Sequence, residues 1–402
     1  MILFLLACGN APKDAAASAA DIDYYSDVKP IIDAKCTGCH VTGGIAPFPL
    51  TTYAEAQPMA PAMAGAVSAR IMPPWPADST CTDYNASRAL TDDQIALIVG
   101  WADQGAAEGD AAKEGLPLDR PGGMSRVDLD LPMPNAYTPV VSPDEYRCFV
   151  IDWPEKTDTY VTGFRAKPGN AAIVHHVIAY HIPADEADDF SALDSGAGYE
   201  CLGGPGGPPG TQAQWIGAWA PGDLGNDFPD GTGMAIEAGS LVVLQIHYNT
   251  STAEAAPDVT AVEVKTDSSV TKQARIVKWF DPLWVNAGTM DIPAGDVTTH
   301  TWVGTVPGKQ DVTVYSSGLH MHTLGQEGTL SLNTDGKDEC LLEIPNWDFH
   351  WQGTYWFSEP KVAHGGDEVT VSCTFNNTTD TDIAWGEGTE DEMCLGLMYV
   401  TL

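Results

Sequence analysis

The chain is 402 residues long, and its 55 acidic residues outnumber its 19 basic residues, which gives a formal net charge of -36 at pH 7. This length exceeds a single ordinary hydrophobic core and predicts two or three domains. An acidic excess spread along the chain repels nucleic acids and anionic membranes, so we do not expect this protein to function by binding polyanions. Hydrophobic residues make up 44% of the chain, and 40 glycines and 29 prolines indicate many turns, so we expect a globular, β-rich protein.

The N-terminus resembles a bacterial export signal. Leu5-Leu6-Ala7-Cys8 has the form of a lipobox, in which Cys8 would be lipidated after cleavage. The apolar run is too short to cross a bilayer, and residues 10–20 form an alanine-rich spacer. We therefore expect a lipoprotein signal and tether over residues 1–20, in an exported protein that is periplasmic or anchored to the outer membrane. A frayed apolar N-terminus is the alternative.

Composition divides the remaining chain into three blocks. Residues 21–112 have helical patterning with long loops, and residues 113–126 are a linker rich in glycine and proline. From residue 127 onward, short β-branched and aromatic runs alternate with turn residues, which is typical of antiparallel β-sandwiches. This region is too long for one small sandwich, so we expect two jelly-roll-like domains, at residues 127–275 and 276–402. The predicted fold is therefore multidomain, with a small all-α domain followed by two antiparallel β-sandwiches.

The helical block contains a haem-attachment motif, Cys36-Thr37-Gly38-Cys39-His40. The thiols of Cys36 and Cys39 can form thioethers with the haem vinyl groups, and His40 can bind the iron. Zinc binding and thiol redox chemistry are alternative interpretations of a single motif of this kind. The flanking helix signals and the lack of a second CxxC favour one covalently bound haem c. The block at residues 21–112 is therefore similar to a small c-type cytochrome.

The second haem ligand is expected to be Met72, because the prolines that follow it restrict the loop that carries the thioether. Met59 and Met63 are rival candidates, and core packing is the alternative role for each methionine. Farther along the chain, Thr91 and Gln94 form a capping box, which predicts the start of a helix. A haem held by histidine and methionine suits an electron carrier better than a catalyst.

Five histidines lie in apolar segments of the β-rich region. They are the adjacent pair His175 and His176, then His247 at the end of a strand-like run, and His320 and His322 in an HxH pattern. On a regular strand the two histidines of an HxH pattern project from one face and can reach one metal, whereas adjacent histidines project oppositely unless the strand is irregular. Each histidine alone is more often a hydrogen-bonded structural residue than a ligand. Imidazole combined with a thioether suits copper better than zinc.

Residues 127–402 resemble the copper type II, ascorbate-dependent monooxygenases, which include peptidylglycine α-hydroxylating monooxygenase and dopamine β-monooxygenase. The resemblance rests on four segments in family order: the adjacent histidine pair, Leu244-Gln245-Ile246-His247-Tyr248, the HxH pair, and Asp391-Glu392-Met393-Cys394. It implies that one copper stores electrons and is held by His175, His176 and His247. It also implies that the other copper activates oxygen and is held by His320, His322 and Met393.

The cysteine count indicates an oxidising compartment. Of nine cysteines, one would carry the lipid and two the haem, which leaves six that disulfides can consume. The resemblance implies two disulfides, Cys148–Cys201 in the first sandwich and Cys373–Cys394 in the second. Cys81 and Cys340 are left over, and a bond between the haem block and the second sandwich is a hypothesis for them.

Two departures from the family pattern narrow the substrate. Members that process peptides place an arginine two residues before the HxH pair, where it grips a substrate carboxylate, but this chain has Gly318. They also carry polar residues after the Met-Cys pair, where this chain has Leu395, Gly396 and Leu397. A small neutral or apolar substrate is therefore expected.

These observations together predict a dicopper monooxygenase that hydroxylates a C–H bond with dioxygen and holds two copper ions and one haem c. The haem block would pass on electrons from an external donor, an ascorbate-like reductant or a redox protein, because a tethered carrier has a high effective concentration. One alternative is an anchored haem and copper protein that relays electrons or sequesters copper without oxidising a substrate. Another is a cytochrome fused to a binding or adhesion module. Nucleic acid is not an expected partner, and a membrane is one only through the lipid anchor.

Overall fold

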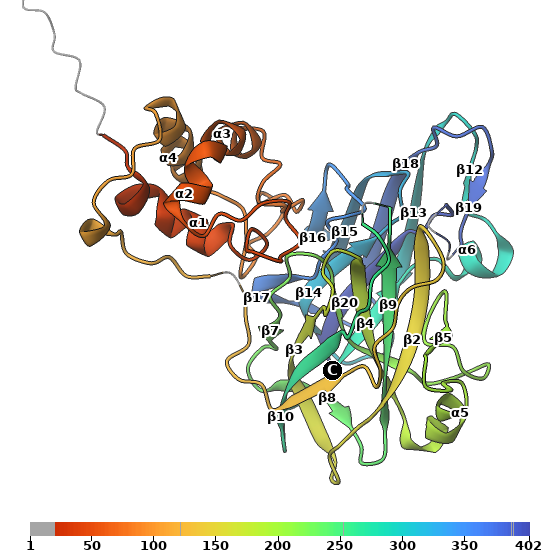
Figure 1. Cartoon of the computed structure of the whole chain (residues 1–402). Coiled ribbons are helices and arrows are strands. Elements are labelled where there is room, and N and C mark those ends of the chain that lie inside the picture. Colours follow the sequence, from red (N-terminus) through yellow and green to blue (C-terminus); the bar gives the residue numbers. More distant parts are fainter. Residues whose placement is uncertain (1–20, 121, 252, 387, 389) are drawn as a thin grey trace, which may run out of the picture.

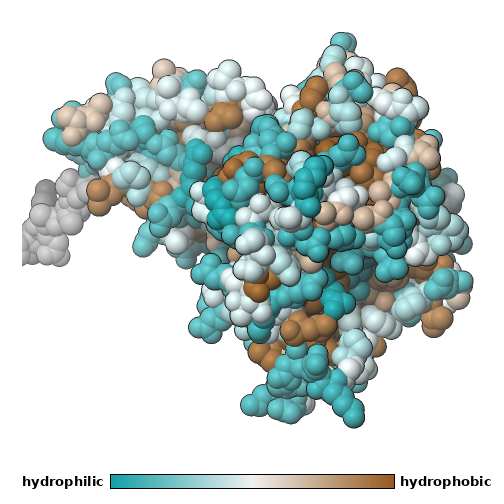
Figure 2. Space-filling model, turned by 90° about the horizontal axis from the view of Figure 1, so that it is seen from below, coloured by the Kyte–Doolittle hydropathy of each residue, from teal (hydrophilic) through white to brown (hydrophobic). Residues whose placement is uncertain are grey.

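The computed structural model describes residues 21–120, 122–251, 253–386, 388 and 390–402. Cys8 and the expected signal and tether lie outside these residues. A small helical block lies beside a larger β-structured body (Figure 1). On the face drawn in Figure 2, hydrophilic residues cover most of the surface and hydrophobic residues form small separate groups. No helix among the described residues is both long and apolar enough to span a membrane.

Short helices make up the N-terminal block. They are η1 (Tyr24–Val28), α1 (Lys29–Lys35), α2 (Tyr53–Ala56), η2 (Gln57–Met59), α3 (Ala60–Ser68), α4 (Asp92–Asp103) and η3 (Ala111–Lys113). The predicted capping box is confirmed at the start of α4, where the Thr91 hydroxyl accepts a hydrogen bond from the Gln94 amide at 3.2 Å and the Gln94 side chain accepts one from the Thr91 amide at 3.0 Å. The helices enclose a core of their own, which contains Tyr24, Ile98 and Trp101.

The first β-sandwich packs two layers of strands against each other. One layer has the order β5-β2-β9-β4-β6, formed by β2 (Asp144–Asp152), β4 (Val174–Ile182), β5 (Tyr199–Glu200), β6 (Gln214–Trp219) and β9 (Leu241–Asn249). The facing strands are β1 (Leu129–Pro132), β3 (Thr159–Lys167), β7 (Asn226–Asp227), β8 (Thr232–Ile236) and β10 (Ala261–Asp267). Phe149, Val177, Leu244 and Val262 meet in the core between the layers, because side chains of a strand alternate between its two faces. After β4 the chain forms η4 (Ala184–Glu186) and α5 (Ala187–Ser191).

The second β-sandwich repeats this two-layer arrangement. One layer contains β11 (Lys272–Trp279), β14 (Val312–His320), β17 (Tyr355–Ala363) and β20 (Leu395–Thr401). The facing sheet has the order β13-β18-β15-β16, formed by β13 (Val297–Thr305), β15 (Gly325–Thr334), β16 (Lys337–Ile344) and β18 (Glu368–Asn376). Leu319, Leu330, Leu342 and Phe375 are buried between them. The remaining elements are α6 (Pro282–Ala287), β12 (Asp291–Ile292) and β19 (Ile383–Ala384).

One continuous sheet of nine strands joins the two sandwiches. The join is a short parallel pairing of β8 with β11, in which Thr232 lies opposite Lys272. β11 extends across the predicted domain boundary at residue 275. It pairs along most of its length with β20, so the whole strand lies with the second sandwich. The two sandwiches are thus hydrogen-bonded neighbours rather than separate bodies on a flexible linker.

Three disulfides cross-link the residues that the structure describes. They are Cys148–Cys201, Cys373–Cys394 and Cys81–Cys340. The first two are the pairs that the resemblance implies. The third attaches the helical block to β16 of the second sandwich, across 259 residues of sequence.

Candidate active site

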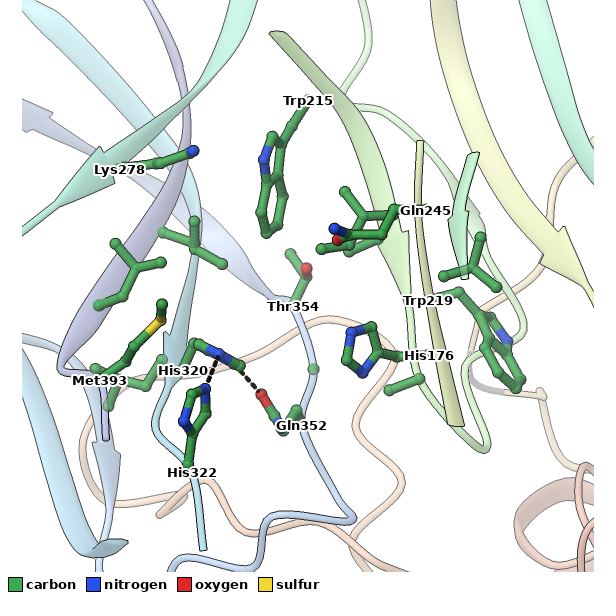
Figure 3. Close-up of a pocket in the computed structure, with 18 of the residues that line it drawn as sticks. His176, Trp215, Trp219, Gln245, Lys278, His320, His322, Gln352, Thr354 and Met393 are labelled. Atoms are coloured by element: carbon green, nitrogen blue, oxygen red, sulfur yellow. Dashed lines mark hydrogen bonds between the residues drawn. The ribbon is translucent and has the colours of Figure 1, made fainter. Parts of the chain in front are cut away.

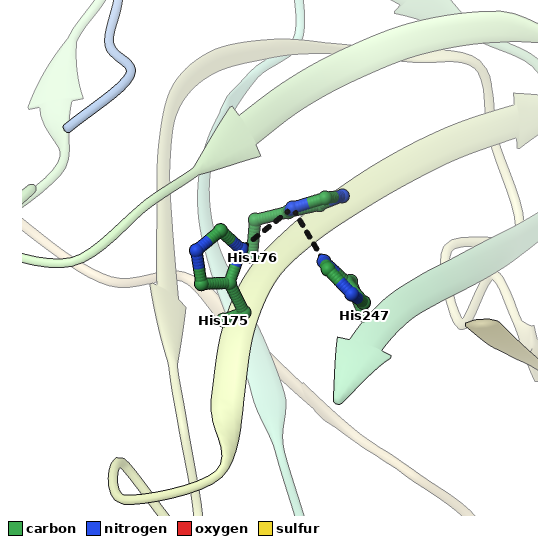
Figure 4. Close-up of side chains that lie close together, drawn as sticks. All are labelled: His175, His176 and His247. Carbon is green, nitrogen blue, oxygen red and sulfur yellow. Dashed lines mark hydrogen bonds between the residues drawn. The ribbon is translucent and has the colours of Figure 1, made fainter. Parts of the chain in front are cut away.

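The first group of candidate ligands lies on two neighbouring strands. β4 and β9 are antiparallel, and His176 of β4 lies opposite His247 of β9. The register shifts between Val174 and His176, so His175 is an extra residue without a paired residue on β9. This is the irregularity that ligation by two adjacent histidines requires. The Nδ1 atoms of His175 and His176 are 3.4 Å apart, and those of His176 and His247 are 3.3 Å apart (Figure 4).

The surroundings of this group keep nitrogen lone pairs available. Burial lowers the pKa of His175 to about 3 and holds the pKa of His176 well below its usual value. His247 donates from Nε2 to the Asp144 carboxylate at 2.8 Å, which lowers the pKa of Asp144 and leaves Nδ1 of His247 as a lone-pair donor. The Nδ1 atom of His176 lies close to the Nδ1 atoms of both His175 and His247, but it can donate a hydrogen bond to only one of them. A cation bound between the three nitrogens would accept all three lone pairs.

The second group is the HxH pair at the end of β14. His320 and His322 bring their Nε2 atoms within 3.2 Å of each other. His320 donates from Nδ1 to Gln352 Oε1 at 2.6 Å (Figure 3). His322 donates from Nδ1 to the Asp391 carbonyl at 2.9 Å. The Gln352 amide cannot be reversed, because its Nε2 donates to the Phe349 carbonyl at 3.0 Å. Since both Nδ1 atoms carry the hydrogen, two Nε2 lone pairs face each other, which is favourable only around a cation.

Met393 brings a thioether to this pair. It is 6% exposed and lies beside His320 and His322, on the opposite side of the cavity from His176 in Figure 3. The buried Glu392 carboxylate accepts hydrogen bonds from the amides of His322 and Leu324, and so ties the HxH segment to the methionine segment. The next residue, Cys394, forms the disulfide with β18. Both chain neighbours of Met393 are therefore fixed.

Both groups border one cavity of about 260 Å³. Phe349 lies between them, because its ring centre is 5.1 Å from that of His175 and 6.1 Å from that of His322. Much of the remaining wall is apolar and includes Trp215, Phe280, Val285, Leu319, Leu395 and Leu397. The cavity can hold a small organic molecule next to the second group while still bordering the first.

Sequence profiles of one family match both halves of this site. Residues 129–255 match the N-terminal domain of the copper type II ascorbate-dependent monooxygenases, and residues 294–401 match the C-terminal domain. Together the matches span more than half of the chain, and each contains one of the two groups. The chain belongs to this family. It is therefore a copper-dependent monooxygenase, and the family uses two copper ions, dioxygen, a substrate and an ascorbate-type reductant.

Solved structures with some likeness to the monooxygenase were also found. BuGH86 in complex with neoagarooctaose is 11% identical, with 67% of this chain and 34% of that chain covered, at a TM-score of 0.16. The Sputnik virophage structure is 8% identical, with 74% and 90% covered, at a TM-score of 0.19. The VP2 subviral particle of infectious bursal disease virus is 10% identical, with 70% and 75% covered, at a TM-score of 0.18. This chain thus spans only about a third of BuGH86, and TM-scores this low support no argument about the monooxygenase.

The N-terminal block of the monooxygenase lies outside the matched ranges. Cys36 and Cys39 are the two cysteines of the described chain that are not in disulfides. Burial raises the pKa of Cys36 to about 12, whereas thiols of redox motifs have lowered pKa values. His40 can donate from Nδ1 to the Phe48 carbonyl at 2.9 Å, which would leave Nε2 as a metal-binding lone pair.

The three candidate methionines of this block have different surroundings. Met63 is buried in the helical core and Met59 packs against that core, so each has a structural role. Met72 is half-buried in the segment that follows α3 and does not belong to that core. Met72 as a haem ligand stays a prediction.

Sequence reasoning missed several residues that support the histidines of the monooxygenase. Asp144 and Gln352 orient His247 and His320, but neither lies in a recognisable motif. Phe349 and His350 lie in the segment between β16 and β17, and the His350 ring centre is 5.8 Å from that of His175. Their only sequence signal is the aromatic and histidine content of that segment, which does not indicate which site it approaches.

Proposed function

We propose that this monooxygenase hydroxylates a C–H bond of a small neutral or apolar substrate. One atom of dioxygen enters the C–H bond and the other becomes water, with two electrons and two protons supplied from outside the substrate. The observation that carries the proposal is the pair of Nε2 lone pairs of His320 and His322, which face each other at 3.2 Å beside Met393 in a largely apolar cavity.

The proposed ligand sets consist of neutral nitrogen and sulfur donors. They are the Nδ1 atoms of His175, His176 and His247 for one copper, and the Nε2 atoms of His320 and His322 with the Met393 thioether for the other. Such donors suit copper, including its reduced form. When bound, the second copper supplies dioxygen activation and the first supplies a stored electron.

The chain's own residues prepare these ligands. Gln352 and the Asp391 carbonyl keep the hydrogens of His320 and His322 on Nδ1, away from the metal side. Asp144 keeps the hydrogen of His247 on Nε2, so that the Nδ1 lone pair faces the other two histidines. The Phe349 ring fills the space between the two groups and limits how much water can lie there.

The cavity has glycine at position 318 instead of an arginine that could bind a substrate carboxylate, which supports a neutral or apolar substrate. A Cβ atom added at Gly318 would lie 3.1 Å from the Gly353 carbonyl oxygen, so backbone occupies the start of the path that a longer side chain would take. Lys278 also lines the cavity, with its ammonium 5.7 Å from the centre of the Trp215 ring. A small aromatic or aliphatic anion is therefore the second candidate substrate.

The electron supply is proposed to be a haem c in the N-terminal block. Cys36 and Cys39 would form its thioethers, and His40 and Met72 would be its axial ligands. When bound, such a haem transfers single electrons from an external donor, either an ascorbate-like reductant or a redox protein. The unpaired thiols and the hydrogen bond of His40 to a carbonyl fit this group.

We also propose that the protein is an exported bacterial lipoprotein, which is either periplasmic or anchored through Cys8 to the outer membrane. The three disulfides support an oxidising compartment. Metabolic labelling with a radioactive fatty acid checks this, because label is expected in the wild-type chain and not in Cys8→Ser. Equal labelling of both would exclude Cys8 as the lipid site.

The test of the proposed reaction is oxygen uptake with copper-loaded protein, an ascorbate-type donor and a panel of neutral, aromatic and singly anionic compounds. The expected result is substrate-dependent uptake, with one atom of isotopically labelled dioxygen in the product. Met393→Ile is the matched control, because isoleucine has a similar volume but no sulfur, so this variant should keep most of the copper. Product oxygen derived from water, or full activity in the control, would contradict the proposal.

A further inference from the structure

The haem-attachment motif lies against a loop of the first sandwich. This loop, residues 220–225, follows β6 directly. A Cβ atom added at Gly222 would lie 3.2 Å from Cys39 Sγ and 2.9 Å from a terminal nitrogen of Arg88, and one added at Gly38 would lie 3.6 Å from Leu224. Gly222 also has a φ of +86°, which disfavours any other residue there. The close approach therefore depends on glycine at this position.

The same loop is tied to Trp219 at the end of β6. The Trp219 indole donates a hydrogen bond to the Asp223 carbonyl at 2.8 Å, and the Asp223 amide donates to the Ala220 carbonyl at 3.1 Å. Trp219 is 8% exposed and belongs to the core of the first sandwich. A single hydrogen bond thus links the residue next to Gly222 to a buried indole ring.

Trp219 in turn is adjacent to the first histidine group. It lies opposite Val177 in the pairing of β6 with β4, and Val177 directly follows His176. Trp219 and His176 line the same cavity (Figure 3). The route from Cys39 to His176 therefore consists of the loop at Gly222, the hydrogen bond from Trp219 to Asp223, and the pairing of β6 with β4 beside His176.

The helical block is fixed in this position rather than held by a loose tether. Besides the Cys81–Cys340 disulfide, the Asp78 amide donates to the Glu343 carbonyl at 2.8 Å and the Asn85 amide donates to the Trp356 carbonyl at 2.7 Å. A fixed contact gives one defined path for electrons, whereas a mobile carrier would use many transient ones.

We infer that the loop at residues 220–225 and Trp219 form the path by which electrons pass from the haem block to the His175, His176 and His247 group. The inference rests on the proposed haem. Each transfer oxidises the haem iron from the ferrous to the ferric state and reduces one copper ion from the cupric to the cuprous state. No bond breaks and no proton moves. Two such transfers supply the electrons for one hydroxylation.

A competing path leads to the second sandwich. Trp75 of the helical block contacts Tyr355 of β17 with ring centres 5.1 Å apart, and Tyr355 is paired with Ser317 of the strand that carries His320. The path through Trp219 is favoured because it starts at Cys39 itself, the residue that would be bonded to the haem. Variants of the two tryptophans separate these routes.

The test follows reoxidation of flash-reduced haem by its visible absorbance, without oxygen or substrate, in the copper-loaded full chain. Trp219→Phe keeps an aromatic ring but removes the bond to Asp223, and Gly222→Ala disturbs the contact with Cys39. Both should slow reoxidation several-fold at unchanged haem content and haem potential. Trp215→Phe is the matched control, because its ring lines the same cavity from the same strand and its buried indole nitrogen has no hydrogen-bond partner in the described chain.

The outcomes separate the inference from the function on which it rests. A chain without covalently bound haem overturns both the haem proposal and the path. Normal haem with unchanged rates in Trp219→Phe and Gly222→Ala overturns the path alone, as does slowing in Trp75→Phe. Copper-free protein and His247→Ala should hold the haem reduced, and rapid reoxidation in His247→Ala would mean that electrons reach the second group directly.

Discussion

Replacing Gln352 by leucine should weaken copper binding at the HxH group and leave the other group unchanged. The Gln352 side chain accepts the Nδ1 hydrogen of His320 at 2.6 Å and is held by its own bond to the Phe349 carbonyl at 3.0 Å. Leucine has similar size but removes both bonds, so His320 can rotate or move its hydrogen to Nε2. Loss of a partner of this kind lowers metal affinity about 10–100-fold, or about 1.4–2.7 kcal/mol.

The assay is a copper titration against a competing chelator in two backgrounds. In His176→Ala the HxH group is the intact site, and Gln352→Leu should reduce its affinity by that factor. In His322→Ala the first group is the intact site, and the same substitution should have no effect. The loss of two hydrogen bonds costs only about 1–3 kcal/mol of folding stability, so the fold should persist. Unchanged affinity in the first background, or equal losses in both, would refute the assignment of Gln352 as the residue that orients His320.

Three further predictions concern the metals, the haem and the fold. Met393→Ile should keep most of the copper yet abolish hydroxylation, whereas His247→Ala should lose copper at the first group. Metal analysis and oxygen uptake together distinguish these two results. Normal hydroxylation rates in both variants would exclude the assigned roles. Cys36→Ser should lose one thioether, seen as a shifted haem absorbance band in the intact protein, while near-ultraviolet circular dichroism of the sandwiches stays the same. Tyr248→Phe should cost about 1–3 kcal/mol in denaturant unfolding, because the buried Asp258 carboxylate loses the Tyr248 hydroxyl at 2.9 Å. Tyr315→Phe is its control and should change stability by less than about 0.5 kcal/mol, since its hydroxyl has only a 3.5 Å contact with Thr401.

Local rules predicted the parts of the structure that depend on neighbours in the sequence. The capping box at Thr91 fixed the start of α4, because its two hydrogen bonds span only three residues. The irregularity at His175 was foreseeable because two adjacent side chains on a regular strand point to opposite faces, and the register shift in β4 meets that requirement. In both cases the relevant contacts are set by strand or helix geometry alone.

The residues that sequence reasoning missed act across long distances in the chain. Gln352 reaches His320 over 32 residues and Asp144 reaches His247 over 103 residues, and no periodicity links either pair. The pairing of β8 with β11 was also unforeseen, since hydrophobic patterning gives the faces of strands but not the order in which they pair. The family resemblance supplied the candidate ligands, and only tertiary structure supplied the groups that orient them.

The two ligand groups share a property that follows from these orienting contacts. Asp144 bonds to the outer nitrogen of His247, and Glu392 bonds to backbone amides, so each carboxylate supports a ligand without being part of a ligand set. Donor sets made of uncharged nitrogen and sulfur favour the cuprous state over the cupric state, because they do not neutralise the higher charge. The proposed reaction requires reduced copper at the second group when dioxygen arrives. With copper bound as proposed, the absence of carboxylates from both ligand sets would make both sites better electron acceptors, in a chain whose net charge of -36 would otherwise favour the oxidised cation.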